Sequence, residues 1–113
     1  MPDPNRRQRA VSFIIKSRTD RRRFFPAPLF SEPAWDMLLK LYGAAIEQRA
    51  LSISALAKAA DVGPSTAARW ITALEQQGLV RRGTMRGTET VSLSQKGWFA
   101  MDSYFENMSS GMI

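Results

Sequence analysis

The chain has 113 residues, 44% of them hydrophobic, a formal net charge of +6, and neither cysteine nor histidine. This length and composition fit one compact domain with tails. Without cysteine there is no disulfide or thiol chemistry, and without histidine the commonest general base and metal ligand are missing. We therefore expect no enzyme activity, no metal and no cofactor. No stretch approaches the roughly 20 apolar residues of a membrane span, which predicts a cytoplasmic protein that does not bind membranes.

The positive charge is concentrated in two regions. Residues 1–30 hold eight basic and two acidic residues, and residues 64–98 hold five basic and two acidic ones. Positive charge sorted in this way is typical of a protein that binds a polyanion, because each neutralised phosphate releases counterions. The alternative interpretation is ordinary solvated surface charge.

The N-terminal part is predicted to be a basic arm followed by a linker. Within residues 6–23, Val11, Ile14 and Ile15 have helical spacing, so this segment is either a short amphipathic helix or disordered until it meets a partner. Residues 24–30 combine phenylalanines with two prolines, which favours an extended linker. Its aromatic side chains either cover the core or form a protein interface.

Two helices are predicted next. The first begins near Ser31 as N-cap, with Pro33 in its first turn, and ends before Leu51. One apolar stripe along it faces a core, formed by Trp35, Leu38, Leu39, Tyr42 and Ile46. Ser54 is the expected cap of the second helix, which is broken by the Asp-Val-Gly-Pro sequence at residues 61–64. Its apolar positions, Leu56, Ala57 and Ala60, are small enough to let another helix approach.

The third helix starts with Gly63 as N-cap and Pro64 at its first position. Its apolar stripe is expected to be buried and consists of Ala67, Trp70, Ile71 and Leu74. The opposite face carries Ser65, Ala68, Arg69 and Thr72, and Thr66 lies between the two faces. Gly78 suits the left-handed position of a Schellman cap in which Leu74 touches Leu79.

A basic β-hairpin and a last helix complete the predicted elements. Residues 79–82 and 88–93 alternate like strands around a mobile tip at residues 83–87. Ser94 is expected to cap the last helix, with Leu93 and Trp98 as a hydrophobic staple. Its apolar residues recur at steps of three and four, at Trp98, Met101, Phe105, Met108 and Met112.

The order of these elements predicts a mainly α protein with a small β-hairpin (α+β), arranged as a winged helix-turn-helix. Residues 1–30 form the arm and linker, residues 31–108 the winged-helix domain, and residues 109–113 a C-terminal tail. Such a domain binds double-stranded DNA by placing helix 64–77 in the major groove and wing 79–93 on the minor groove.

Each candidate DNA-binding residue has a physical role. Arg69 suits a bidentate contact to guanine, Ala68 a thymine methyl group, and Ser65 and Thr72 base or phosphate. Arg86 at the wing tip suits a narrow minor groove. Phosphate contacts are expected from Arg81, Arg82 and Lys96. The full candidate set is Ser65, Thr66, Ala68, Arg69, Thr72, Arg81, Arg82, Arg86 and Lys96. For Arg69 the alternative is an ion pair with Glu75 or another acid.

Residues 51–105 resemble the winged helix of the MarR family of bacterial transcriptional regulators. The similar stretches are Ile53-Ser54-Ala55-Leu56-Ala57, the run from Ser65 to Arg82 that contains Leu74-Glu75-Gln76-Gln77-Gly78-Leu79-Val80, and Val91-Ser92-Leu93-Ser94-Gln95-Lys96-Gly97. The resemblance implies a small, nucleoid-associated regulator. The family's wing carries Asp-x-Arg, whereas this chain has Met85-Arg86-Gly87, so only the arginine is matched.

The sequence also predicts the partners, with double-stranded DNA first. A homodimer is expected because one winged helix reads few base pairs, with the last helix and the Val11, Ile14, Ile15 stripe as candidate contacts. The alternative function is a winged-helix protein–protein interaction module in a transcription or replication assembly, using residues 24–30 to bind a protein partner. A sequence-independent nucleoid protein is a further option.

Overall fold

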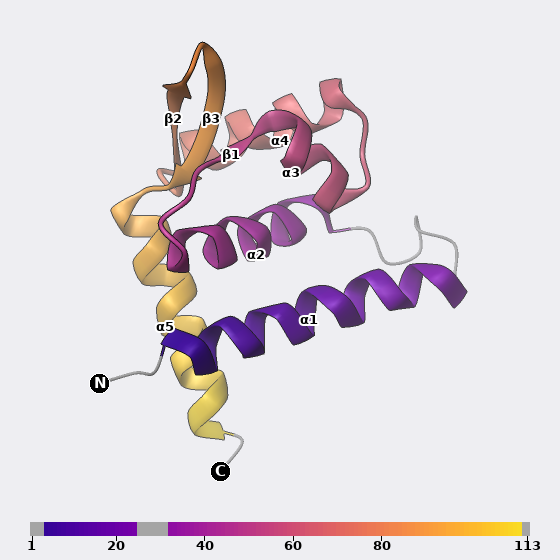
Figure 1. The fold of residues 1–113 in the computed structure, drawn as a ribbon, viewed down its shortest axis with the longest axis vertical. Helices are drawn as coiled ribbons and strands as arrows, with labels where there is room; N and C mark the ends of the chain where they lie inside the picture. Colours follow the sequence, from indigo (N-terminus) through magenta and orange to yellow (C-terminus); the bar gives the residue numbers. More distant parts are fainter. Residues whose placement is uncertain (1–3, 25–31, 112–113) are drawn as a thin grey trace.

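The computed structural model describes residues 4–24 and 32–111, which form a helical protein with one small sheet (Figure 1). The elements in chain order are α1 (Pro4–Phe24), α2 (Pro33–Ile46), β1 (Leu51–Ser52), α3 (Ile53–Ala60), α4 (Pro64–Gln76), β2 (Val80–Met85), β3 (Thr88–Leu93) and α5 (Gln95–Gly111). The predicted fold class, a winged helix-turn-helix, is confirmed.

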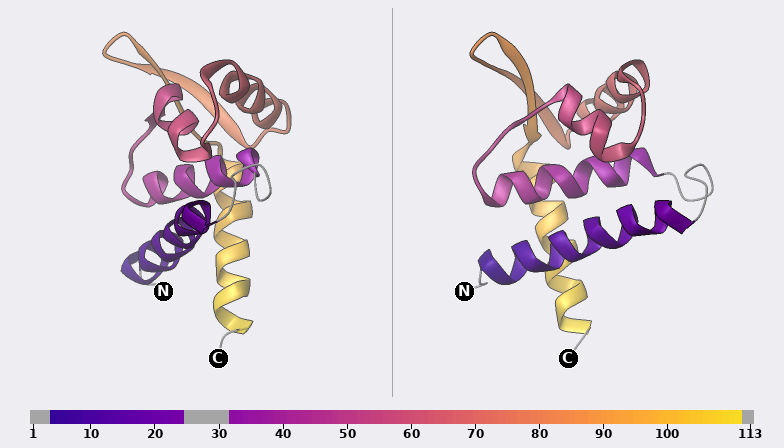
Figure 2. Two further views of the ribbon diagram at one scale, coloured as in Figure 1. Left: turned by 90° about the vertical axis from the view of Figure 1, so that its right-hand side faces the viewer. Right: turned by 45° about the vertical axis from the view of Figure 1, so that its right-hand side comes forward.

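Helix α2 lies at the centre of the molecule and is covered on several sides. Helices α3 and α4 pack against one side of it, α1 runs along the opposite side, and α5 crosses near one end (Figures 1 and 2). The predicted stripe is packed on the core, with Leu39 and Tyr42 buried. Met37, Leu41 and Ala44 are buried as well, because several elements pack around α2 and not on one side of it alone.

The basic arm is a helix of 21 residues that is part of the folded domain. Val11 is only 1% exposed, and its side chain lies against Gly43 of α2. Ile14 and Ile15 pack on the same core. Val11 is therefore not available for the predicted dimer contact, and Ile14 and Ile15 are partly buried within the chain. Residues 25–30 of the predicted linker lie outside the described residues.

Two arginines fasten α1 to the rest of the domain. Arg7 forms ion pairs with Asp102 and Glu106 of α5. Arg18 pairs with Asp36 on α2, and its guanidinium lies 3.5 Å from the carboxylate of Glu32. Burial alone lowers the pKa of Arg18, but its hydrogen bonds and charge interactions with these carboxylates outweigh that effect and raise the pKa.

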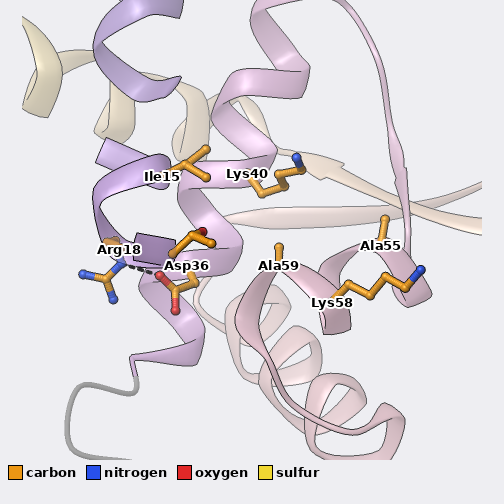
Figure 3. Close-up of a pocket in the computed structure, with 8 residues that line it drawn as sticks. Ile15, Arg18, Asp36, Lys40, Ala55, Lys58 and Ala59 are labelled. Carbon is orange, nitrogen blue, oxygen red and sulfur yellow. Dashed lines mark hydrogen bonds and ion pairs between the residues drawn. The ribbon is translucent and has the colours of Figure 1, made fainter. Parts of the chain in front are cut away.

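The Arg18–Asp36 pair lies at the wall of a groove of about 410 Å³ between α1, α2 and α3. Figure 3 shows Ile15 and Arg18 from α1 on one side of this groove, with Lys40 of α2 and Lys58 of α3 also lining it. Helix α1 is thus joined to its neighbours by both apolar packing and charge.

Two predicted helix starts can be compared with the structure. Helix α2 has Pro33 in its first turn as expected, but its N-cap residue is Glu32 and not the predicted Ser31, which lies outside the described residues. The predicted cap Ser54 is wrong, because the Oγ of Ser52 accepts a 3.1 Å hydrogen bond from the amide of Ala55. Strand β1 brings Ser52 to this position, and a two-residue strand has no local sequence signal.

The sheet has three strands in the order β1-β3-β2, all antiparallel. Strand β3 pairs with β2 from Val80↔Leu93 to Met85↔Thr88, and with β1 at Leu51↔Val91. The predicted five-residue tip is too long, because strand β2 continues through Gly83 to Met85 and the turn is only Arg86-Gly87.

The predicted C-terminal end of α4 and the predicted start of α5 are confirmed. Gly78 has a φ of 76°, and the amide of Leu79 donates to the carbonyl of Leu74 at 3.0 Å, which is the Schellman geometry. Ser94 caps α5, since its Oγ accepts a 3.0 Å hydrogen bond from the amide of Gly97. Both features turn the chain sharply on either side of the hairpin and so position it next to α4.

Candidate nucleic-acid interface

The outward face of α4 carries short polar residues and one arginine. The helix starts at Pro64 after Gly63 and buries Ala67, Ile71 and Leu74 against the core. Ser65, Ala68, Arg69 and Thr72 are exposed, as predicted, and Thr66 is half-buried between the two faces. Gln76, which the prediction omitted, is exposed three turns after Ser65, at a spacing that would have placed it on this face.

Arg69 does not form the ion pair with Glu75 that was considered for it. Glu75 instead contacts Arg82. Among residues 4–24 and 32–111, no carboxylate or hydrogen-bond partner contacts the Arg69 side chain. Its guanidinium is therefore available to bind a ligand in front of α4.

Trp70 differs from its prediction. It was expected in the buried stripe, but it is 38% exposed. Successive helical residues are separated by about 100°, so Trp70 lies at the flank of the buried side, whereas Ala67, Ile71 and Leu74 lie near its middle. Part of its large indole therefore remains in solvent.

Arg82 on β2 makes two contacts to α4 and one across the hairpin to β3. Its Nε lies 3.2 Å from Glu75, its Nη1 2.9 Å from Glu89, and its Nη2 3.0 Å from the Oγ1 of Thr72. Hydrogen bonds to Glu89 and Glu75 raise the pKa of Arg82. The side chain predicted to contact phosphate is thus engaged within the protein, where it sets the position of the wing relative to α4.

The wing ends in a two-residue turn that presents an arginine. Arg86 and Gly87 have φ values of 52° and 79°, and positive φ at both central residues is the type I′ pattern of tight hairpins. Arg86 is exposed at this tip, and Arg81 is exposed farther down β2. Met85, which the prediction did not consider as a contact, is also exposed beside the turn.

The base of the wing is held by α5. Lys96 donates a 3.0 Å hydrogen bond to the carbonyl of Gln77 at the end of α4, and Ser94 donates one of 2.5 Å to the carbonyl of Gly78. Lys96 is exposed, and its ammonium group has further donors for a second partner.

The arrangement brings the predicted residues to one side of the molecule. Helix α4 and the hairpin both lie on the side of α2 opposite α1 (Figures 1 and 2). Within the described ranges there is no cluster of three or more carboxylates that could hold a metal ion. No helix in this part of the chain is long and apolar enough to cross a membrane.

A comparison with protein-family models supports the resemblance seen in the sequence. The model of the MarR family matches residues 30–84, which include α2, α3, α4 and nearly all of β2. The resemblance to the MarR family is therefore confirmed for this part of the chain. A comparison with curated protein sequences gives no significant match.

Several solved structures have a similar fold. A MarR family transcriptional regulator from Silicibacter pomeroyi is 22% identical with a TM-score of 0.60, and the match covers 71% of this chain and 53% of that one. A MarR family protein from Bacillus stearothermophilus is 19% identical with a TM-score of 0.60, over 96% and 75% of the two chains. A putative DNA-binding protein from Ralstonia eutropha is 29% identical with a TM-score of 0.57, over 65% and 94%.

These similarities define the class of the fold. The chain has the winged-helix fold of MarR-family transcriptional regulators, which are not enzymes, and the match spans about half the length of the Silicibacter regulator. The match to the Bacillus protein extends over nearly the whole chain, so the similarity reaches beyond the winged helix.

Proposed function

We propose that this protein is a sequence-specific regulator of transcription that binds double-stranded DNA. Helix α4 enters the major groove, which is about 12 Å wide and accepts one helix, and the β2–β3 hairpin lies on the adjacent minor groove. The observation that carries this proposal is the exposed row on α4, in which Arg69 has no carboxylate partner among the described residues and lies among the short side chains of Ser65, Ala68 and Thr72.

The contacts divide into those that read bases and those that fix position. Arg69 binds guanine through its two-pronged guanidinium, and Ala68 touches a thymine methyl group. Ser65 and Thr66, in the first turn of α4, reach phosphate or a base edge. The hydroxyl of Thr72 accepts from Arg82 and keeps its own proton to donate to the DNA.

The wing and the start of α5 supply the remaining contacts. Arg86 enters the minor groove, where a narrow A·T-rich segment has the most negative potential. Arg81 and Lys96 bind phosphates and set the register without reading sequence. Because Arg82 already has three partners, we assign it to positioning the wing and expect little direct contact with phosphate.

Arg69→Ala is the first test of this function. Binding sites are selected from random duplexes with the wild-type chain, and affinities for the selected site and its single-base variants are then measured. We expect the substitution to weaken binding to the selected site by about 1 to 3 kcal/mol and to relax one position. Lys40→Ala removes the same charge from α2, away from α4, and should leave the sequence preference unchanged.

Two outcomes would contradict this assignment. An equal loss of affinity for every sequence would make Arg69 a phosphate contact only. Absence of salt-dependent DNA binding by the intact chain would instead favour a winged-helix module that binds proteins.

We also propose that the protein acts as a homodimer on two half-sites about 34 Å apart, because symmetry doubles a small interface. The stripe of Val11, Ile14 and Ile15 is used inside the chain, so α5 is the remaining candidate contact. Phe99 on α5 is 72% exposed and Tyr104 is partly exposed, so this helix offers aromatic side chains that a second copy would cover.

A further inference from the structure

Helix α1 has a continuous outward stripe of mostly basic residues. Its positions are separated by alternating steps of three and four residues, so they form one line along the helix. The members are Arg6, Arg9, Phe13, Lys16, Asp20 and Arg23. We call these residues the outer stripe. At 1.5 Å per residue it is about 26 Å long.

The outer stripe faces away from α4. Val11 lies on the opposite side of α1 and packs against Gly43 of α2. Helix α2 separates α1 from α3 and α4 in all three views of the fold (Figures 1 and 2). The protein therefore presents basic residues on two opposite sides.

Some basic residues of α1 form ion pairs with the rest of the domain, and others lie on its outer face. Arg7 and Arg18 point toward the domain and pair with its carboxylates. Among the described residues, no carboxylate contacts Arg6 or Arg9. Lys16 lies 3.0 Å and Arg23 4.0 Å from Asp20, so the outer stripe has four cations against one carboxylate. Exposed pairs of this kind are weak and exchange readily with another anion.

The composition of the stripe indicates which partner it binds. A second copy of α1 would place cations against cations, so self-association through this face is unfavourable. Three of the four cations are arginines, whose planar guanidinium matches phosphate oxygens two at a time. A regular row of phosphates, such as a nucleic-acid backbone, can pair with all four cations of the outer stripe.

The duplex on α4 cannot also reach the outer stripe. The molecule measures 42 × 35 × 24 Å, whereas DNA stays straight over a persistence length of about 500 Å. Wrapping one duplex from α4 around to α1 would require a sharp bend of more than a quarter turn within a few base pairs.

We propose that the outer stripe of α1 is a second, sequence-independent DNA-binding surface that holds a separate duplex, so the protein bridges two DNA segments. This inference rests on the proposed function of α4 for the first duplex. The phosphate contacts of the stripe carry no sequence information, and Phe13, which is 70% exposed, lies among them as an apolar contact to the sugar edge.

The test uses the full chain and two labelled duplexes. An immobilised duplex with the selected site fills the α4 surface, and an unrelated duplex is then added in solution at low salt. We expect the wild type to capture the second duplex. The double variant Arg6→Gln and Arg9→Gln should capture about tenfold less or lower, with the salt slope of capture reduced by about 0.9 for each lost phosphate contact. Its binding to the selected site should be unchanged.

A matched control removes two charges elsewhere. Lys40→Gln with Arg49→Gln changes exposed cations of α2 and the loop after it, off the outer stripe, and should capture DNA like the wild type. Equal capture by the Arg6, Arg9 variant would overturn the proposal. The second duplex would then be held by a surface that this variant retains, such as the second α4 of a dimer. Failure of the α4 hypothesis gives a different result. The wild type then binds DNA without sequence preference, and the Arg6→Gln and Arg9→Gln variant still lowers that binding.

The other possible partners of a basic stripe are outcomes of the same experiment. If the wild type captures no second duplex but sediments with vesicles that contain anionic phospholipid, and Phe13→Ser abolishes sedimentation, the partner is a membrane and the DNA proposal is wrong. If neither DNA nor vesicles bind, the stripe is solvated surface charge.

Discussion

At the scale of single residues, Gly97 shows how closely α5 meets the hairpin. A Cβ atom built on Gly97 would lie 2.0 Å from the carbonyl oxygen of Leu79, far inside van der Waals contact. The same stretch holds the Ser94 cap, so this contact and the cap together fix the angle between α5 and β2. Only a residue without a side chain fits here.

We therefore expect Gly97→Ala to lower the free energy of unfolding by about 1 to 3 kcal/mol, as overpacking in a tight contact does. Gly43→Ala makes the same chemical change inside α2, where the new Cβ would lie 3.7 Å from Val11. That control should be stabilising by about 0.5 to 1 kcal/mol, because alanine favours the helix. Denaturant unfolding of both variants gives the comparison, and equal effects of the same sign would refute it.

Arg82 and its neighbour Arg81 separate wing positioning from phosphate binding. Arg82→Ala removes the contacts to Glu75, Glu89 and Thr72, so amides of β2 and β3 should exchange hydrogen faster. Arg81→Ala leaves hairpin exchange unchanged and lowers the salt slope of DNA binding by about 0.9. Hydrogen exchange and salt titrations of the two variants measure these effects. A slope change for Arg82→Ala without faster exchange would make Arg82 a phosphate contact.

At the scale of elements, α1 is the helix whose role changes most between sequence and structure. As an arm it would be expendable for folding, but Val11 is buried against α2 and two arginines fasten the helix at both ends. Deleting residues 1–23 would therefore remove part of the core together with the basic charge. Point substitutions on its outer and inner faces are the informative changes.

Val11→Ala tests whether α1 folds with the domain. Loss of two buried methyl groups and the cavity left beside Gly43 should cost about 2 kcal/mol in the unfolding of the whole protein. Ser12→Ala, at the exposed next position, is the control and should change stability by less than about 0.5 kcal/mol. Thermal or denaturant unfolding followed through the tryptophans, all of which lie outside α1, reports on the rest of the domain. An unchanged transition would mean that α1 folds independently.

At the scale of the whole molecule, the proposed activities are assigned to opposite surfaces. Helix α4 and the wing lie on one side of α2, and α1, which carries the outer stripe, lies on the other (Figure 1). Helix α5 runs past the N-terminal end of α1, where Arg7 pairs with Asp102 and Glu106, and it carries the exposed aromatic residues Phe99 and Tyr104. We expect a partner chain on α5 to leave the α4 surface open, so dimerisation and binding to the selected site can be changed independently.

Phe99→Ser tests the proposed dimer contact on α5. Replacing a phenylalanine that is 72% exposed should leave folding intact but weaken self-association, since the apolar area available to a partner falls. Sedimentation equilibrium of the wild type and variant measures the dimer constant. Phe13→Ser, on the like-charged outer stripe, is the control and should not change it. A reversed pattern would place the contact on α1.

Local chemistry determined much of this fold before any tertiary contact is considered. The Gly63-Pro64 start of α4, the Schellman cap at Gly78 and the Ser94 cap of α5 are set by residues within one or two helical turns, and all three were predicted. The exposed face of α4 followed from the period of the helix. The resemblance to MarR-family proteins could also be found from the sequence, because the matching residues form continuous stretches of the chain.

Tertiary structure decided the features that depend on distant partners. Strand β1 exists because Leu51 meets Val91, forty residues away, and this pairing makes Ser52 the cap in place of Ser54. Trp70 is partly exposed because it lies at the flank of the side of α4 that packs on the core. Arg82 fixes the position of the wing because the carboxylates of Glu75 on α4 and Glu89 on β3 both contact it. Helix α1 belongs to the core because Val11 packs against Gly43 of α2. Periodicity shows which face of an element is apolar, but only packing decides how much of that face is covered and by what.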